Sequence, residues 1–334
     1  LISSIFSISN NWFSFLMVGP KLCNLYQSSN SILCKLMIVR AFGMSFRLCA
    51  KVWSATSLSL SISIKRIPFI LSILGSIFLG TERSINSFSL KVINSNILSN
   101  QALEVEIENF DENKTQDLEK IFNDKKVDFC IRDKNYKNFK VLLCDMDATM
   151  IANETLDDLV KITGSDYNVD ETSKLAMEGK IDLRTTLKNR VEILKGQPKK
   201  LIDEVLKGIQ FNSGGKTLVA TLNKLGFESN LITGGFKPIS TFVGEKLGFK
   251  NVISNEFNFD DNDCFTGDYI PITGEKNSKY KYMEKVSSEK NISFDEMVSV
   301  GDGSNDLQML KHSGLGIGYH AHQIIKDNIK NQIN

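Results

Sequence analysis

From about residue 140 to the end of the chain, short apolar runs alternate with patterns typical of helices. Five runs have the length and composition of buried parallel strands, and they cover residues 140–144, 229–233, 252–254, 297–300 and 315–318. Apolar residues at helical spacing lie between these runs, notably over 216–225 and 279–289. Strands that alternate with helices predict an α/β fold with a doubly wound parallel sheet, here over residues 137–330.

The first two expected strands are separated by a long insertion. Residues 154–210 show no strand pattern, but apolar residues recur at helical spacing, as Leu156, Leu159 and Val160 do. We therefore expect a small helical cap domain over about 154–212. Such a cap can roof an active site at the carboxyl ends of the strands.

Upstream of this domain the pattern changes twice. Residues 102–108 alternate apolar and acidic side chains as a half-buried strand does, and 127–131 form a second expected strand. Thr115 is a candidate N-cap for a short helix between them. We interpret residues 96–136 as the remnant of an N-terminal accessory domain, because so small a unit is not expected to fold alone.

Residues 1–95 differ in chemistry from everything that follows. Residues 1–100 hold nine Lys and Arg side chains and one acid, Glu82, a formal charge of +8. The uncharged stretch within this segment, residues 67–81, is 15 residues long, whereas a helix needs roughly 20 residues to span a bilayer. We interpret 1–95 as a leader that is disordered or outside the natural coding sequence, with a weak membrane anchor or a transit peptide as the alternatives.

Composition narrows the class of protein further. The net charge of +1 and the ordinary composition exclude neither a soluble enzyme nor a membrane-attached one. The basic residues are scattered and form no nucleic-acid-binding patch, so we expect a small-molecule substrate and neither a nucleic acid nor a membrane as partner. Six cysteines without CxxC spacing indicate free thiols in a reducing compartment, so we expect a cytoplasmic protein. The three histidines are expected to be surface or packing residues.

Acidic residues gather directly after two of the expected strands. Asp145 and Asp147 follow the first strand, and Asp302 and Asp306 lie in the glycine-rich loop after 297–300. Since the carboxyl ends of parallel strands meet at one edge of a sheet, we expect these side chains to lie together. Four crowded carboxylates need a cation, and hard oxygen ligands suit Mg²⁺.

A phosphate site is predicted beside these acids. Thr233 and the two glycines after it offer a hydroxyl and free backbone N–H groups at a helix start. A positive charge is still needed to neutralise a transferring phosphoryl group. Lys279 is the best candidate, and Lys276 and Lys281 are its competitors.

These motifs, in this order, resemble the four motifs of the haloacid-dehalogenase superfamily: the DxDxT of 145–149, Thr233, Lys279 and the GDGxND of 301–306. More narrowly, four segments are similar to the phosphoserine phosphatase family within it, namely DMDATMIANE (145–154), LKNRVEILKG (187–196), LITGGF (231–236) and GDGSNDLQMLKHSGLGIGYHAH (301–322). The resemblance covers roughly 140–325. Residues 96–136 lie where bacterial members carry an ACT-like regulatory domain.

The resemblance implies roles for the acids. Asp145 would be the nucleophile that forms an aspartyl-phosphate, and Asp147 would be the general acid and then the general base. Asp145, the backbone carbonyl of Asp147 and Asp302 would hold Mg²⁺, with Asp306 supporting the metal shell.

The resemblance also implies a substrate, O-phospho-L-serine. Thr233, Gly234, Lys279 and Asn305 would bind its phosphate. Arg190 would take its carboxylate and Glu154 its ammonium. Two positions depart from the family pattern, since Leu183 stands where relatives usually have Phe and His322 where many have Lys.

Other functions fit part of the pattern. A receiver-like signalling module also has a parallel sheet, clustered acids, a Thr and a Lys, but it lacks an acid two residues after its phosphorylated Asp. Asp147 and the helical insertion therefore favour an enzyme. Within the enzymes, the alternatives are a related phosphatase acting on another small phosphomonoester and a phosphotransferase to homoserine.

Overall fold

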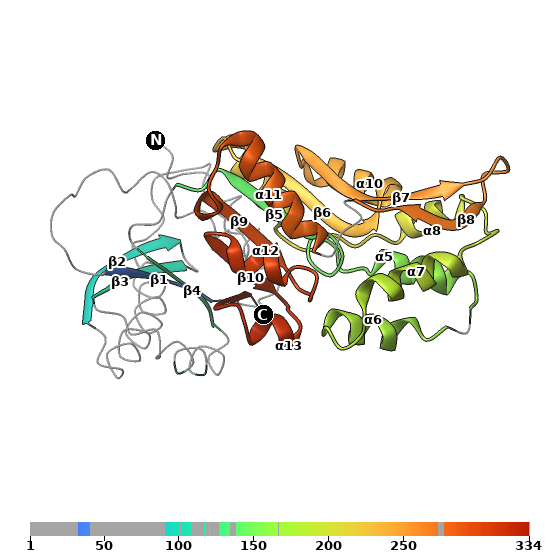
Figure 1. Cartoon of the computed structure of the whole chain (residues 1–334). Coiled ribbons are helices and arrows are strands. Elements are labelled where there is room, and N and C mark those ends of the chain that lie inside the picture. Colours follow the sequence, from blue (N-terminus) through green and yellow to red (C-terminus); the bar gives the residue numbers. More distant parts are fainter. Residues whose placement is uncertain are drawn as a thin grey trace, which may run out of the picture. The chain divides into compact units, whose positions relative to one another are not determined.

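The computed structural model describes residues 33–40, 91–99, 102–108, 117, 120, 127–133 and 138–333, except 166 and 273–276 (Figure 1). Within it the chain divides into two compact units. One holds the described residues from 130 onward, and the other holds the described residues between 33 and 129. The two units are described separately.

The larger unit is built on a sheet whose strands run almost all in parallel. These strands are β5 (Val141–Cys144), β6 (Glu228–Phe236), β7 (Asn251–Phe259), β8 (Phe265–Ile270), β9 (Met297–Gly301), β10 (Leu315–Tyr319) and β11 (Asn331–Ile333). Their order is β11-β10-β9-β5-β6-β7-β8, and β8 alone among them runs antiparallel to its neighbour. The doubly wound parallel sheet predicted from the sequence is confirmed.

The short strand β5 occupies the middle of this order. All four of its side chains are fully buried, as its unbroken apolar run predicts. The next strand in the chain, β6, pairs with one edge of β5, and β9 pairs with the other. The chain therefore reverses its direction of winding at β5, and such a point is where open α/β sheets place their ligands.

Helices follow the strands much as the apolar spacing predicts. They are α9 (Gly215–Lys224), α10 (Lys237–Leu247), α11 (Ser278–Lys290), α12 (Leu307–His312) and α13 (Gln323–Lys326), with a 3-10 turn at Phe294–Glu296. Val141 and Leu143 of β5 share an apolar cluster with Met283 of α11 and Met309 of α12. No helix in the described part of the chain has the length and apolar character to cross a membrane.

The insertion after β5 is helical, and its helices are α5 (Thr155–Ile162), α6 (Val169–Met177), α7 (Leu183–Ile193) and α8 (Leu201–Lys207). Helices α5, α6 and α7 form one group, green in Figure 1. Asn168 caps α6 through the N–H of Glu171, and Asp182 caps α7 through the N–H of Thr185 at 2.9 Å. The local sequence thus sets where these two helices begin.

A hairpin that the sequence did not predict extends the sheet. β7 runs well past its expected 252–254, and β8 pairs with it. Stacked rings fill the corner, with Phe236 and Phe257 centroids 3.6 Å apart and Phe265 edge-on to Phe257. The N–H of Gly196, just beyond α7, donates to the Phe265 carbonyl at 2.8 Å, so this hairpin is joined to the cap.

The smaller unit is described through three antiparallel strands in the order β2-β3-β1. They are β1 (Leu33–Arg40), β2 (Lys91–Ser99) and β3 (Ala102–Glu108), and β3 matches its predicted range. The strand β4 (Val127–Asp133) covers the other expected strand. β1 lies inside the segment interpreted as a leader, and 67–81 lies outside the described residues. So does the helix expected from Thr115, apart from Asp117 and Lys120, which are helical.

We predict that Gly316→Ala destabilises the protein. A methyl group at this position in β10 would lie 2.1 Å from the carbonyl oxygen of Leu310, and a backbone atom cannot move aside cheaply. We expect a loss of about 1–3 kcal/mol in the free energy of unfolding, measured by urea titration. The matched control is Gly208→Ala, whose methyl group would meet nothing nearer than 3.5 Å. Equal losses for the two variants would contradict the steric argument.

Candidate active site

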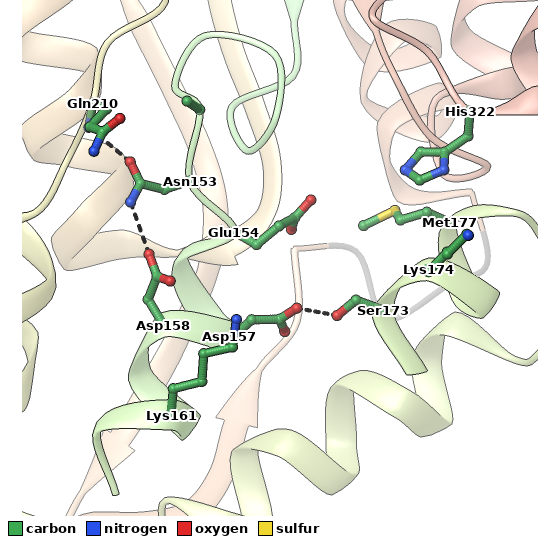
Figure 2. Close-up of a pocket in the computed structure, with 11 residues that line it drawn as sticks. Asn153, Glu154, Asp157, Asp158, Lys161, Ser173, Lys174, Met177, Gln210 and His322 are labelled. Carbon is green, nitrogen blue, oxygen red and sulfur yellow. Dashed lines mark hydrogen bonds between the residues drawn. The ribbon is translucent and has the colours of Figure 1, made fainter. Parts of the chain in front are cut away.

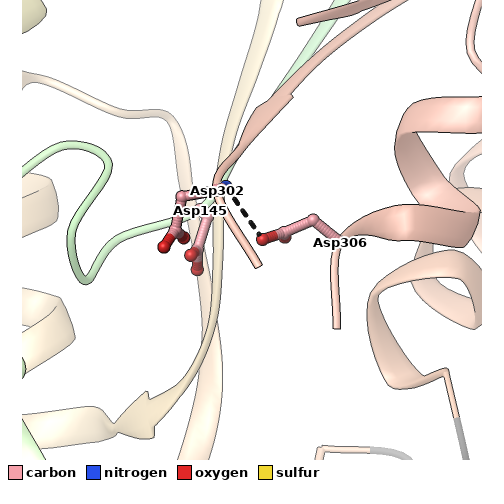
Figure 3. A group of neighbouring side chains, drawn as sticks. All are labelled: Asp145, Asp302 and Asp306. Atoms are coloured by element: carbon pink, nitrogen blue, oxygen red, sulfur yellow. Dashed lines mark hydrogen bonds between the residues drawn. The ribbon is translucent and has the colours of Figure 1, made fainter. Parts of the chain in front are cut away.

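The ends of β5 and β9 bring three carboxylates together. Asp145 follows β5, Asp302 follows β9, and Asp306 closes the same loop (Figure 3). One carboxylate oxygen of each lies within 4.8 Å of those of the other two, and all three side chains are buried. This is the donor set that a hard divalent cation prefers. Three of the four acids expected to lie together form this cluster, and the side chain of Asp147 is not part of it.

The loop from Gly301 to Asp306 depends on its glycine. A Cβ at Gly301 would lie 2.3 Å from the Asp306 carboxyl carbon, so no larger residue fits. Asp306 Oδ2 accepts hydrogen bonds from the N–H groups of Asp302 at 3.3 Å and Gly303 at 3.2 Å. The motif therefore folds around the Asp306 carboxylate, which in turn fixes Asp302.

Lys279 supplies the positive charge at this cluster. Its ammonium lies 2.5 Å from Asp145 Oδ1 and 2.6 Å from Asp306 Oδ1, and its side chain is 2% exposed. Burial opposes the charged form, but Asp145 and Asp306 outweigh it and hold the pKa of Lys279 above its usual value. Lys281 is half exposed and pairs with Glu284, and Lys276 lies outside the described residues.

Lys279 does not neutralise the whole cluster. Burial raises the pKa of Asp306 to about 6, and the nearby Asp145 adds to that rise. Burial likewise raises the pKa of Asp302 well above its usual value, with Asp145 and Asp306 adding to it. Three buried carboxyl groups thus share one buried ammonium, and ionising all of them would need a further cation.

The side chain of Asp147 lies outside the three-carboxylate cluster and is held by two threonines. Its Oδ1 accepts from the N–H of Thr155 at 2.9 Å, and its Oδ2 accepts from the hydroxyl of Thr233 at 3.2 Å. Ala148 has a φ of 51°, a left-handed turn directly after Asp147. Burial raises the pKa of Asp147 while these hydrogen bonds lower it, and the net shift is upward. A carboxyl of raised pKa is suited to give and take a proton near neutral pH.

The phosphate-binding residues expected from the sequence lie around one cavity. It has a volume of about 480 Å³, and Gly234, Lys279 and Asn305 are among the residues that line it. Thr233 lies beside it, with its hydroxyl accepting from the N–H of Gly235 at 2.8 Å. The side-chain oxygen of Asn305 is buried without a hydrogen-bond partner in the described part of the chain. This oxygen is an acceptor, so a ligand N–H, an O–H or a cation could satisfy it, whereas the amide N–H₂ of Asn305 is the part that can donate to a phosphoryl oxygen.

A second cavity, of about 490 Å³, lies under the cap (Figure 2). Glu154, Asp157, Ser173 and His322 are among the residues that line it. Burial raises the pKa of Glu154 well above its usual value, and the charges of Asp147 and Asp157 add to that rise. His322 Nε2 lies 3.7 Å from Asp302 Oδ2, and burial lowers the pKa of His322.

Arg190 is buried on α7 and lines neither of these two cavities. Its Nε lies 3.3 Å from Asp157 Oδ1, and its Nη2 donates to Ser173 Oγ at 2.6 Å. Neither Asp157 nor Ser173 belongs to a motif that the sequence predicts to be functional. Asp157 follows Glu154 by three residues, one helical turn, so that spacing could have placed both on one face. Nothing in the sequence points to Ser173.

The cap also meets the loop that carries Asp302. Ser304 donates through its N–H to the Met177 carbonyl at 2.9 Å and through its hydroxyl to the Ala176 carbonyl at 2.8 Å. A Cβ at Gly303 would lie 2.7 Å from the Met177 sulfur. The end of α6 therefore rests directly on this loop.

With this geometry the chain can be compared with known proteins. The sequence model of the haloacid dehalogenase-like hydrolases matches residues 142–311, about half of the chain. The chain belongs to this family of hydrolases.

Its similarity is to the phosphoserine phosphatases of that family. It is 32% identical over 191 residues to the phosphoserine phosphatase of Methanocaldococcus jannaschii, covering 57% of this chain and 90% of that protein. It is 31% identical over 188 residues to that of Archaeoglobus fulgidus, covering 56% of this chain and 54% of that one. The chain thus spans about half the length of this second relative.

Solved structures agree with these relatives. A substrate-bound phosphoserine phosphatase complex is 31% identical, with a TM-score of 0.56 over 59% of this chain and 93% of that one. A HAD family hydrolase from Salmonella enterica serovar Typhi has a TM-score of 0.67 over 90% and 94% of the two chains. At 22% identity, this second likeness shows the fold alone.

We predict that Lys279→Met strongly destabilises the metal-free protein. The change keeps the length of the side chain but leaves Asp145 and Asp306 facing each other without their shared ammonium. Removing one partner of a buried ion pair typically costs about 3–5 kcal/mol, which urea unfolding in the presence of a chelator would measure. The matched control is Lys281→Met on the same helix, at an exposed position. A loss no larger than that of the control would show that Lys279 does not balance these acids.

Proposed function

We propose that this protein is a Mg²⁺-dependent phosphatase that hydrolyses O-phospho-L-serine to L-serine and phosphate. The observation that carries the proposal is the pairing of two aspartates on one turn. Asp145 contacts the buried ammonium of Lys279, and Asp147 is held by Thr155 and Thr233. The names of the relatives supply the substrate.

In the first step, an oxygen of Asp145 attacks phosphorus and the bond to the serine oxygen breaks, which gives an aspartyl-phosphate. Asp147 donates its proton to the leaving serine oxygen, and its raised pKa supports this role. In the second step, Asp147 takes a proton from the water that attacks the phosphoryl group. Asp145 is then regenerated and phosphate leaves.

The phosphoryl oxygens would be held by residues of the 480 Å³ cavity and its border. Lys279 would balance their charge, and the hydroxyl of Thr233, the backbone of Gly234 and the side chain of Asn305 would bind them. These groups come from different elements that meet at the edge of the sheet. Their fixed positions would stabilise the charge that develops in transfer.

The donor set fits Mg²⁺. Asp145, Asp302 and the backbone carbonyl of Asp147 would hold the ion, with Asp306 supporting Asp302 and Lys279. Three buried carboxylates beside one ammonium leave a negative excess that a divalent cation relieves. Bound there, Mg²⁺ supplies charge neutralisation and orientation for phosphoryl transfer.

The cap would recognise the amino-acid part of the substrate. Glu154 lines the second cavity and would bind the ammonium, and Arg190 would bind the carboxylate. L-serine would be the product, so we place the reaction last in serine biosynthesis, in the cytoplasm. The receiver-like alternative is set aside because the chain belongs to a hydrolase family.

We predict that Asp145→Asn abolishes phosphate release from phosphoserine while the variant stays folded, because an amide does not attack phosphorus. Asp147→Asn should lower kcat by about 10²–10⁴-fold, the usual contribution of general acid–base catalysis. Phosphate release is measured for each variant beside circular dichroism spectra. Substantial turnover by a folded Asp145→Asn variant would refute the nucleophile assignment. Turnover of other small phosphomonoesters in preference to phosphoserine by the unaltered protein would refute the substrate.

We predict that Mg²⁺ raises the melting temperature more at about pH 7.5 than at about pH 5. The metal binds carboxylates without protons, and burial holds the pKa of Asp306 at about 6 and that of Asp302 above its usual value. As pH falls through these raised pKa values, protons compete with Mg²⁺ and its stabilisation is lost. Thermal unfolding with Mg²⁺ and with chelator measures both shifts. Equal shifts at the two pH values, or a full shift in Asp302→Asn, would contradict the site.

A further inference from the structure

We propose that Asp157 and Ser173 are positioning residues that hold Arg190 for the carboxylate of the substrate, and thereby set the preference for amino-acid phosphates. The inference rests on the proposed function and deepens it. It concerns two residues that neither the sequence motifs nor the catalytic steps use.

The three side chains form a closed ring inside the cap. Each comes from a different helix: Asp157 from α5, Ser173 from α6 and Arg190 from α7. Asp157 Oδ1 faces Arg190 Nε at 3.3 Å, Arg190 Nη2 donates to Ser173 Oγ at 2.6 Å, and Ser173 Oγ donates to Asp157 Oδ2. Figure 2 shows the Asp157 to Ser173 contact. All three side chains are buried.

Burial makes this ring necessary before any substrate arrives. A guanidinium keeps its charge in proteins, so a buried Arg190 needs a counter-charge in the empty enzyme. Asp157 provides it, and Ser173 fixes the rotation of both partners. Without the ring, Arg190 would have to be ordered by the substrate, which weakens binding.

The ring also leaves Arg190 able to bind a ligand. The guanidinium has five N–H groups. Nη2 donates one to Ser173, while Nε faces Asp157 as an ion pair but makes no hydrogen bond to the described residues, and Nη1 takes part in neither contact. Glu154 precedes Asp157 by one helical turn, and both line the 490 Å³ cavity. Glu154, the residue proposed for the ammonium, therefore shares this cavity with two members of the ring, Asp157 and Ser173, and Arg190 lies directly behind them in contact with both.

A different reading is that Asp157 binds the substrate ammonium directly, since it lines the same cavity as Glu154. Its two oxygens are already engaged, one by Arg190 and one by Ser173. We therefore assign it an action through Arg190. The two readings predict different losses for different substrates.

The experiment compares three phosphomonoesters. Phosphoserine carries both ammonium and carboxylate, phosphoglycolate only the carboxylate, and phosphoethanolamine only the ammonium. Asp157→Asn should lower kcat/KM for the first two by about ten- to hundred-fold, mainly through KM, and leave phosphoethanolamine within about twofold. The ratio between substrates does not depend on how much of a variant is folded.

A double-mutant cycle tests whether Asp157 acts through Arg190. In an Arg190→Ala background, Asp157→Asn should cause no further loss for phosphoserine. Ser173→Ala, which removes one hydroxyl, should cause a smaller loss with the same substrate pattern. If Asp157→Asn does not fold, the substrate pattern of Ser173→Ala tests the inference instead. The control is Glu192→Gln, which also changes an acid to an amide on the cap, at an exposed position of α7. It should leave the kcat/KM of phosphoserine relative to phosphoethanolamine, and that of phosphoglycolate relative to phosphoethanolamine, unchanged.

Three results would overturn the inference. An equal loss for all three substrates would give Asp157 a structural role only. A loss confined to phosphoserine and phosphoethanolamine would make it an ammonium ligand. If the losses in kcat/KM from Asp157→Asn and Arg190→Ala were fully additive, Asp157 would not act through Arg190. Failure of the proposed function would look different: the unaltered enzyme itself would then show no preference for phosphoserine, before any variant is compared.

Discussion

One buried ammonium facing an excess of carboxylates is the constraint on which the site depends. Lys279 contacts Asp145 and Asp306 at once, and each of these acids belongs to a different strand end. An unpaired buried charge costs several kcal/mol, a large part of the stability of an ordinary domain. The lysine therefore joins α11 to the ends of β5 and β9, and its contacts hold the catalytic geometry as well as the fold.

The same constraint explains why the acids differ in behaviour although all are aspartates. Asp306 is tied to backbone N–H groups and to Lys279, so it acts as part of the scaffold. Burial and the charges of Asp145 and Asp306 raise the pKa of Asp302, and Lys279 opposes that rise. Asp147 faces two hydroxyl-bearing residues, Thr155 and Thr233, instead of the lysine. Environment, and not residue type, separates the structural, metal-binding and proton-transfer roles that we propose for these aspartates.

The sequence predicted the sheet well because its signals were local. The buried run of β5 and the acids directly after it follow from strand length and from the common edge of parallel strands. The hairpin of β7 and β8 was missed because its stability comes from rings distant in sequence, such as Phe236 on Phe257. Polar residues also interrupt its alternation.

The site was predicted in the same uneven way. Asp145, Asp302, Asp306 and Lys279 could be found because each stands beside a recognisable strand or helix. The partners of Arg190 could not be, since Asp157 and Ser173 meet it only when three helices pack. Composition and the spacing of residues along one helix do not show which side chains of different helices will meet. The phosphoserine assignment likewise comes from resemblance to relatives and not from residue pattern alone.

The contact of Ser304 and Gly303 with the end of α6 has a consequence for how the protein can evolve. The backbone between Asp302 and Asn305 serves two surfaces at once, one facing the carboxylate cluster and one facing Met177. A Cβ at 303 would lie 2.7 Å from the Met177 sulfur and 3.0 Å from Asn305 Oδ1, so a substitution there would call for adjustment in the cap and in the loop together. We therefore expect changes in substrate preference to arise more readily at cap residues remote from 176–177, where this loop need not change.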